Sequence, residues 1–129
     1  MRLLVDTSVL IDALRLRRGR RQLLAELVRS GHTLATSALN IAEIFAGMRP
    51  EEEANTRRLL NPLECYEVTP PSAELAGRFK RDWARKGRTL TLTDTLIAAT
   101  ALEHGCVLVT DNRKDFPMPE LELHPLPGE

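Results

Sequence analysis

The amino-acid sequence predicts an α/β fold of three layers, with a mainly parallel central sheet of four to five short strands flanked by helices. Short apolar runs bounded by polar residues recur along the 129 residues and are typical of strands buried on both faces. Between them lie segments with apolar residues three and four positions apart, which is the spacing of amphipathic helices. The alternation of the two patterns is characteristic of a parallel sheet with crossover helices.

The first half of the chain alternates two predicted strands with four helices. An apolar run from Leu3 to Val5 forms a strand that ends at the carboxylate of Asp6. Five arginines and one glycine between residues 15 and 21 connect the first helix to the second, and Ser37 is a suitable N-cap for the third. The expected elements are a strand over 2–6, helices over 7–14 and 22–30, a strand over 33–36, and helices over 38–48 and 50–60.

The second half contains the remaining strands and two more helices. Pro62 stops the preceding helix, Gly87 ends a long amphipathic helix, Thr93 is a suitable cap for the next one, and Gly105 ends it. The expected elements are a strand over 64–68, helices over 73–86 and 94–104, a strand over 107–110 and an edge strand over 121–124.

Composition limits the class of protein. Lys and Arg number 18, as do Asp and Glu, so the formal net charge is zero, which argues against a simple polycation but permits a local basic face. Cys65 and Cys106 lie far apart in apolar contexts and are expected to be reduced core thiols. The sequence shows neither a signal peptide nor an apolar run of about 18 residues, so we expect a cytoplasmic protein with a single domain over residues 1–129.

Four carboxylate-bearing segments interrupt the apolar framework at distant points of the sequence. Asp6, Glu43 and Asp94 each lie in or at the end of an apolar run, and residues 110–116 carry further acids. Ionised carboxylates rarely occupy such positions unless something offsets their desolvation. Several that are alike in setting suggest one shared site, and a hard divalent cation is the natural ligand of such a site.

Structural explanations compete with this interpretation. Asp6 could be a helix cap, although Ser8 is well spaced to orient its carboxylate or to bind a metal-bound water. Asp94 could be an acid favoured by the helix dipole in a first turn. Glu43 is harder to explain in this way, because it lies mid-helix among small apolar residues with no Lys or Arg three or four positions away.

The fourth acidic segment could be a polar turn that follows a strand, for which Asp and Asn are well suited. It contains Asp111, Asn112 and Asp115. The residues alone do not decide which of the three faces the acidic site.

Taken together, the four segments resemble the PIN-domain nucleases, and specifically the VapC toxins of toxin–antitoxin pairs, over nearly the whole chain. The matching residues are Asp6-Thr7-Ser8 after the first strand, Asn40-Ile41-Ala42-Glu43 in mid-helix, Thr93-Asp94 before an Ala-rich helix, and Thr110, Asn112, Asp115 and Phe116 of a Thr-x-Asn-x-x-Asp-Phe signature. Asp111 departs from the family pattern, in which this position is frequently basic. The resemblance therefore favours Asn112 and Asp115 in the fourth segment.

The resemblance implies a PIN-like fold and a metal-dependent endoribonuclease, the toxin of a VapBC-type pair, which hydrolyses RNA phosphodiester bonds at an acidic Mg²⁺ or Mn²⁺ site. It also implies a homodimer and a small VapB-like antitoxin. Helices 38–48 and 50–60 would offer the antitoxin an apolar groove, although core packing explains their apolar residues equally well.

The resemblance also implies roles for the site residues. Asp6 and Asp94 would bind the metal directly, whereas Glu43 and Asp115 would bind it directly or through water, or would orient the nucleophile. The residues expected to hydrogen-bond around these acids are Ser8, Thr110 and Asn112.

Two basic clusters are candidate RNA contacts, and each could instead be a solvated helix face. The candidates are Arg15, Arg17, Arg18, Arg20 and Arg21 in the first cluster and Arg85, Lys86 and Arg88 in the second. With one Trp, one Tyr and three Phe in the chain, base stacking is expected to contribute little.

Three other functions fit parts of the same pattern. A PIN nuclease of RNA maturation would have the same site but no antitoxin, and a small neighbouring reading frame would distinguish the two. A catalytically idle PIN-fold binding module would be expected to lack one or more of the acids. A phosphatase-like hydrolase could share Asp6 and would act on small phosphomonoesters.

Overall fold

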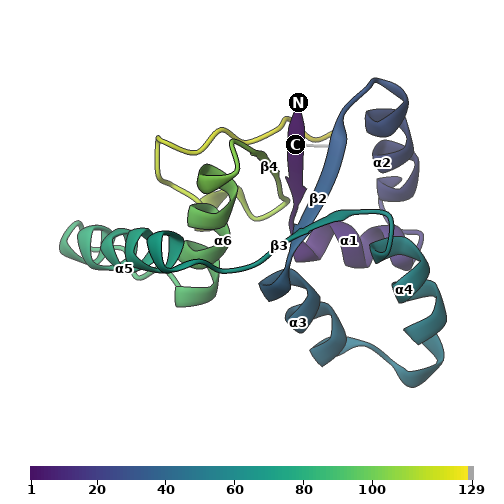
Figure 1. Ribbon diagram of the computed structural model, residues 1–129, viewed down its shortest axis with the longest axis horizontal. Helices are drawn as coiled ribbons and strands as arrows, with labels where there is room; N and C mark the ends of the chain where they lie inside the picture. Colours follow the sequence, from purple (N-terminus) through teal and green to yellow (C-terminus); the bar gives the residue numbers. More distant parts are fainter. Residues whose placement is uncertain (128–129) are drawn as a thin grey trace.

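A computed structural model of the protein describes residues 1–127 (Figure 1). The strands are β1 (Arg2–Val5), β2 (Thr33–Ser37), β3 (Glu64–Tyr66) and β4 (Val107–Val109). The α-helices are α1 (Thr7–Leu14), α2 (Arg20–Arg29), α3 (Ala38–Gly47), α4 (Glu53–Leu60), α5 (Pro70–Arg85) and α6 (Leu92–Glu103), and the short 3₁₀ helices are η1 (Pro50–Glu52) and η2 (Arg113–Asp115). Over the described residues, no helix is both long enough and apolar enough to span a membrane.

The strands form one parallel sheet in the order β3-β2-β1-β4, which confirms the predicted fold class. Leu3 of β1 is in register with Leu34 of β2 on one side and with Val107 of β4 on the other. Because parallel strands need long crossover connections, helices separate them along the chain. The carboxyl ends of all the strands lie along one edge of the sheet, where the segments after β1, β2 and β4 meet.

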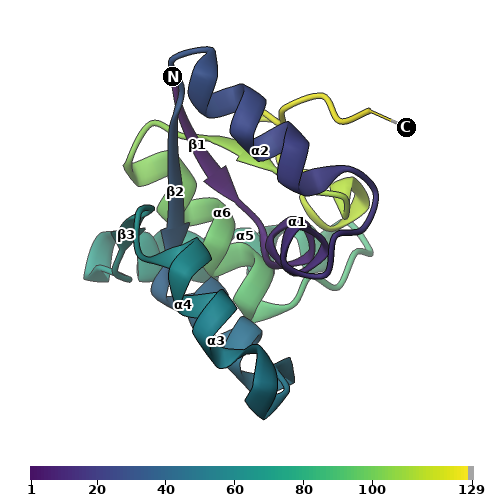
Figure 2. The same cartoon turned by 90° about the vertical axis from the view of Figure 1, so that its right-hand side faces the viewer.

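Helices cover both faces of the sheet (Figure 2). Successive side chains of a strand point to opposite faces, so Leu3 and Val5 join an apolar core with residues of α1 and α2, while Leu4 joins a second core with residues of α5 and α6. Helix α3 lies beyond the carboxyl edge and contacts both α1 and α6. This arrangement brings the segment after β1 and the helices α3 and α6 together at one end of the sheet.

Two helices begin earlier than the sequence predicts. Helix α5 begins at Pro70, because proline fits the first helical turn, and Thr69 and Ser72 form a capping box there. Helix α2 begins at Arg20, directly after Gly19, which adopts the left-handed conformation with φ of 66°.

Helix α6 also begins earlier than predicted, and this correction affects a site residue. Its N-cap is Thr91 rather than Thr93, because the Thr91 hydroxyl accepts a hydrogen bond of 3.1 Å from the backbone N–H of Asp94. Asp94 therefore lies inside the first turn of α6 instead of next to its cap.

The predicted edge strand over 121–124 is wrong as a continuous strand. Among the described residues this segment forms one isolated bridge, between Leu108 and Leu123, and the backbone N–H of His124 donates to the Leu108 carbonyl at 2.8 Å. Pro125 follows at once and has no N–H to donate, so it limits further pairing.

The prediction for the two cysteines is half correct. Both are free thiols, and Cys106 is buried as expected. Cys65 is exposed, because it lies on the edge strand β3 and points away from the core that the neighbouring Tyr66 joins.

Candidate active site

Asp6 is a buried carboxylate at the carboxyl edge of the sheet. It directly follows β1, is 4% exposed, and its backbone N–H donates to the Val109 carbonyl at 2.9 Å. Its Oδ2 accepts a hydrogen bond of 2.7 Å from the Thr110 hydroxyl, and its Oδ1 accepts one of 3.3 Å from the Asn40 side-chain amide. Strand β4 thus fixes the backbone of Asp6, while the segment after β4 and helix α3 hold its carboxylate in place.

Asn40 is a site residue that the sequence analysis did not single out as functional. The Ser37 hydroxyl donates to Asn40 Oδ1 at 2.6 Å, which leaves the amide nitrogen to donate to Asp6 and, at 3.0 Å, to Thr7 Oγ1. The Thr7 hydroxyl in turn donates to Glu43 Oε1 at 2.6 Å. The signal available in the sequence was a polar Asn three positions before Glu43, on the same face of a largely apolar helix.

Asp94 and Asp115, together with Asp6 and Glu43, form a group of four acids whose charges are linked through Asp94. Burial is the main cause that raises the pKa of Asp6, and the carboxylates of Asp94 and Glu43 raise it further. Burial likewise raises the pKa of Asp94, to which Asp115 and Glu43 add. The four carboxylates therefore share one electrostatic environment, although they come from four separate segments.

Asp111 is directed away from this group by two arginines. The Arg20 guanidinium donates to Asp111 Oδ1 at 2.6 Å, and a guanidinium nitrogen of Arg18 lies 3.1 Å from the same oxygen. At Asp111, where this chain departs from the family pattern, the carboxylate is thus neutralised by two cations: Arg18 in the connection between α1 and α2, and Arg20 in the first turn of α2.

The other two polar residues of the same segment differ in their surroundings. The backbone N–H of Asn112 donates to the Thr110 hydroxyl at 3.0 Å, while its exposed side chain has no hydrogen-bond partner in residues 1–127. Asp115 is the residue whose charge acts on Asp94. The effect of its charge on the pKa of Asp94 favours Asp115 as the fourth acid, and Asn112 contributes its backbone N–H to the hydrogen bond with Thr110.

The donors of this site fit a hard divalent cation. They are carboxylate oxygens, which Mg²⁺ and Mn²⁺ prefer. Within residues 1–127, no three acidic, His or Cys side chains converge closely enough to hold an ion alone, so an ion would retain several waters. The Ser8 hydroxyl is buried and has no partner among the described residues, which leaves it available to bind such a water.

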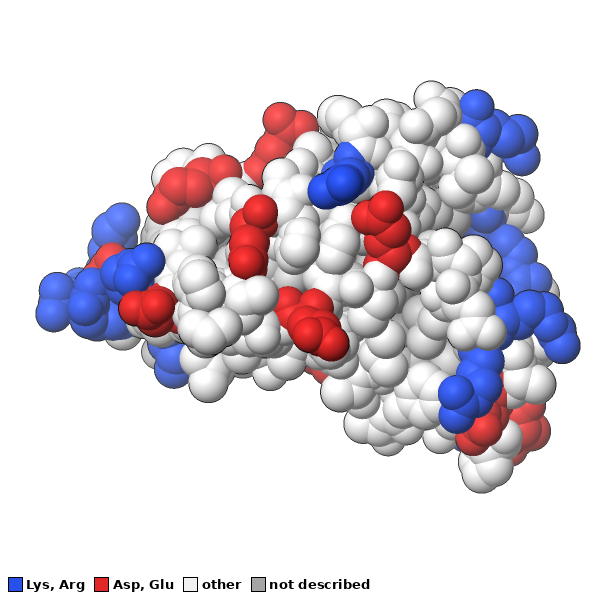
Figure 3. All heavy atoms as spheres, in the orientation of Figure 1, with Lys and Arg blue, Asp and Glu red and all other residues white. Residues whose placement is uncertain are grey.

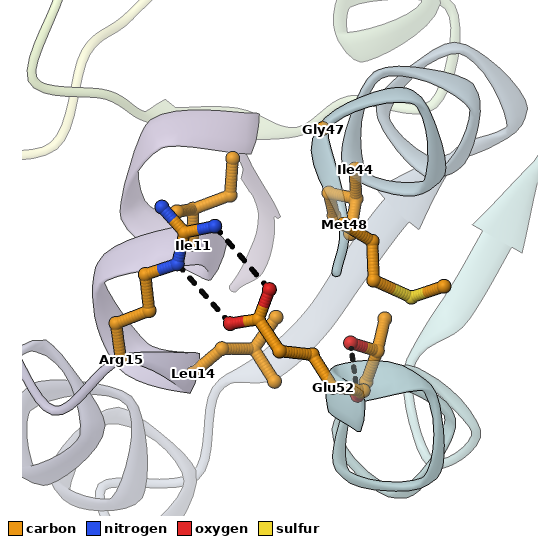
Figure 4. Close-up of a pocket in the computed structure, with 8 residues that line it drawn as sticks. Ile11, Leu14, Arg15, Ile44, Gly47, Met48 and Glu52 are labelled. Atoms are coloured by element: carbon orange, nitrogen blue, oxygen red, sulfur yellow. Dashed lines mark hydrogen bonds and ion pairs between the residues drawn. The ribbon is translucent and has the colours of Figure 1, made fainter. Parts of the chain in front are cut away.

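The arginine cluster between residues 15 and 21 is largely paired within the protein. Arg15 donates to Glu52 through Nε at 3.2 Å and through a terminal nitrogen at 3.3 Å, across a small pocket between α1 and α3 (Figure 4). Arg18 is paired with Asp111. Arg20, which we predicted as an RNA contact, is poorly placed for that role, because its side chain is 1% exposed and is bound to the same carboxylate.

We expect the metal-free protein to lose stability as the pH rises. The pKa values of Asp6 and Asp94 are raised above 3.8 in the folded protein, so the folded state binds more protons than the unfolded state just above that pH. The extra proton affinity of Asp6 and Asp94 in the folded state stabilises the fold fully at a pH below their pKa in the unfolded chain. This stabilisation is lost as the pH rises through their pKa in the folded protein. Thermal unfolding in chelator from about pH 4 upward should show this decrease, and Asp6→Asn should make it shallower. An unchanged pH dependence in the variant would contradict the assignment.

Comparison with known proteins agrees with this geometry. Residues 3–118 match the PIN domain family model. The chain is 36% identical over 120 residues to Ribonuclease VapC19 of Mycobacterium tuberculosis, covering 92% of this chain and 96% of that protein. It is 37% identical over 116 residues to Ribonuclease VapC10 of the same organism, covering 90% and 86%.

Solved structures show the same fold. VapBC2 from Rickettsia felis, bound to a DNA fragment from its promoter, has a TM-score of 0.85 at 24% identity, covering 96% of this chain and 98% of that chain. A toxin–antitoxin complex from Klebsiella pneumoniae has a TM-score of 0.77 at 29% identity, covering 92% and 94%. The family model matches most of the chain, and the relatives that share more than a third of its residues are VapC ribonucleases. The chain therefore belongs to the PIN-domain family and groups with the VapC ribonucleases in it.

Proposed function

We propose that the protein is a metal-dependent endoribonuclease and the toxin of a toxin–antitoxin pair. The observation that carries this proposal is Asp6, a buried carboxylate held by hydrogen bonds from Thr110 and Asn40 and close enough to Asp94 and Glu43 for their charges to act on it. The charge of Asp115 acts in turn on Asp94. Nucleases of this family generally depend on a divalent metal ion. Mg²⁺ or Mn²⁺ is the ion that we propose for this site.

The arrangement of the acids suggests a division of roles. A bound ion would neutralise charge on the scissile phosphate and lower the pKa of a bound water. Asp6 is the fixed ligand, because Thr110 and Asn40 restrict its orientation, and Asp94 is its partner on α6. Glu43 is exposed to solvent and is oriented by a hydroxyl, so it is placed to accept a proton from the attacking water.

The test is cleavage of structured RNA by purified, antitoxin-free protein with Mg²⁺, with Mn²⁺ and with chelator. We expect cleavage with a divalent ion and none in chelator. The ion should also raise the melting temperature, because a ligand that binds only the folded state at a hundred times its Kd adds about 2.7 kcal/mol of stability. Cleavage that persists in chelator, or a melting temperature insensitive to millimolar metal, would contradict the metal site.

A small VapB-like antitoxin is the second part of the proposal. Solved relatives are VapBC and other toxin–antitoxin complexes, which favours this partner. The predicted apolar groove on α3 and α4 has fewer exposed apolar residues than expected, because Ile44 and Leu60 are buried in the core. Phe45, Met48 and Leu59 remain partly exposed for contact with a partner.

The antitoxin also separates this proposal from a PIN nuclease of RNA maturation. The product of a small neighbouring reading frame should co-purify with this protein and inhibit its cleavage of RNA. A homodimer and a cytoplasmic location complete the proposal, and native mass measurement of the protein without antitoxin tests the former.

A further inference from the structure

The two basic clusters differ in how far the protein itself neutralises them. In the first, Arg15, Arg18 and Arg20 have carboxylate partners within the protein, whereas Arg17 and Arg21 are exposed and have no carboxylate within 4.0 Å in residues 1–127. In the second, at the end of α5 and in the loop that follows it, Arg85, Lys86 and Arg88 are exposed. Within residues 1–127, none of those three has a carboxylate within 4.0 Å. Lys and Arg side chains gather at this end of the molecule (Figure 3). Its positive charge is therefore available to an anionic ligand.

An aromatic ring lies within the second cluster. Trp83, the only tryptophan of the chain, is half-buried and packs against the core beneath α5 and α6. The Lys86 ammonium lies 4.4 Å from the ring centroid, and the Arg88 guanidinium carbon lies 5.9 Å from it. A hollow of about 260 Å³ adjoins the ring, and besides Trp83 and Lys86 it is lined by the apolar Leu75, Phe79 and Pro119, by Arg78, and by the acids Asp82 and Glu120. Exposed cation–π contacts are weak, so a nucleobase can replace a cation on the ring while that cation moves to a phosphate.

The second cluster adjoins the proposed active site through two elements. The Arg88 guanidinium donates to the backbone carbonyl of Lys114 in η2, the short helix that ends at Asp115. The loop that carries Arg88 leads directly into α6, whose first turn contains Asp94. A strand of RNA that lies on this cluster would therefore extend toward the acids.

We propose that Trp83, Arg85, Lys86 and Arg88, here called the Trp83 surface, bind the single-stranded part of the RNA substrate and direct it to the acidic site. This inference rests on the proposed nuclease function. Stacking on an aromatic ring requires an unpaired base, which is why the ligand is single-stranded. The cluster between residues 15 and 21 is not part of this binding surface.

The charge test measures binding without cleavage. Anisotropy of a labelled single-stranded RNA in chelator should give a dissociation constant about three- to tenfold higher for Arg85→Gln and for Lys86→Gln. Each variant should also lower the slope of log K against log salt by about 0.7, the value for one lost phosphate contact on a single strand. The matched controls Arg17→Gln and Arg21→Gln remove the same charge from exposed arginines of the first cluster and should bind as the wild type does.

The stacking test uses two substitutions at one position. Trp83→Leu retains an apolar side chain but removes the aromatic face, and it should weaken binding about tenfold. Trp83→Phe retains a face and should bind nearly as the wild type does, which separates stacking from any loss of folding. Equal weakening by Leu and Phe would overturn the stacking role.

The remaining outcomes are also decisive. RNA binding that is unaffected at Trp83 and Lys86, or absent in the wild type, overturns the proposal. If Trp83→Leu weakens binding of the antitoxin but not of RNA, the surface is a protein interface instead. If the wild type cleaves RNA but the Trp83, Arg85 and Lys86 variants bind RNA as well as it does, only the proposal for the Trp83 surface is refuted. Binding through that surface without metal-dependent cleavage refutes only the nuclease.

Discussion

Substitution of Asp94 by Asn is expected to abolish RNA cleavage and, without metal, to stabilise the fold. Burial disfavours the ionised form of Asp94 in the folded protein, and repulsion from Asp115 and Glu43 adds to this cost. Asparagine has the same shape without the charge, so the metal-free variant should melt about 2–4 °C higher than the wild type. Cleavage should fall at least about a hundredfold, because the amide cannot replace a metal-binding carboxylate.

The two readouts together distinguish a functional acid from a structural one. A structural cap would lose stability on substitution, whereas a site acid should gain stability and lose activity. Glu53→Gln is the matched control, since Glu53 is an exposed acid of α4 that pairs with Arg57 at 3.3 Å, and it should change neither quantity appreciably. Asp94→Asn with near-normal cleavage, or with a lowered melting temperature in chelator, would remove Asp94 from the proposed site.

Substitution of Arg20 by Ala is expected to cause the largest loss of stability, about 3–5 kcal/mol. Arg20 is 1% exposed, and its guanidinium lies 2.6 Å from Asp111, whose side chain is 9% exposed. Removing the cation leaves a nearly buried carboxylate without its closest partner. Arg18, at 3.1 Å from Asp111, compensates only in part because its side chain is half exposed. Urea unfolding at neutral pH gives the change in free energy.

Two further variants identify the cause of this loss. Arg18→Ala removes the exposed partner of the same carboxylate and should cost less than about 1 kcal/mol. Adding Asp111→Ala to Arg20→Ala should recover part of the stability, because the unpaired carboxylate is then absent. Arg20→Ala with an effect as small as that of Arg18→Ala would show that the pair contributes little.

Local patterns in the sequence determined the fold class and the approximate position of all the strands and α-helices that the structure describes, but not of the short helix η2. Apolar runs and helical spacing depend on the residues of one segment, so the parallel sheet could be predicted without knowing what packs on what. Asp6, Glu43 and Asp94 could likewise be selected as candidate site residues from the sequence, because a carboxylate inside an apolar run is costly to bury wherever the chain folds. The cap at Thr91 was missed because Thr91 and Thr93 are both suitable N-caps, and sequence alone does not choose between them.

Tertiary structure alone decided which polar groups meet. Asp111 and Arg20 are 91 positions apart, and nothing in either segment indicates that they pair. The same reason kept Asn40 from being recognised, since its hydrogen bond to Asp6 exists only once α3 lies beyond the carboxyl edge of the sheet. The folded chain also distinguished the two basic clusters, because Arg15, Arg18 and Arg20 of the first are paired with carboxylates, whereas the second lies beside Trp83 and next to the elements that carry Asp94 and Asp115.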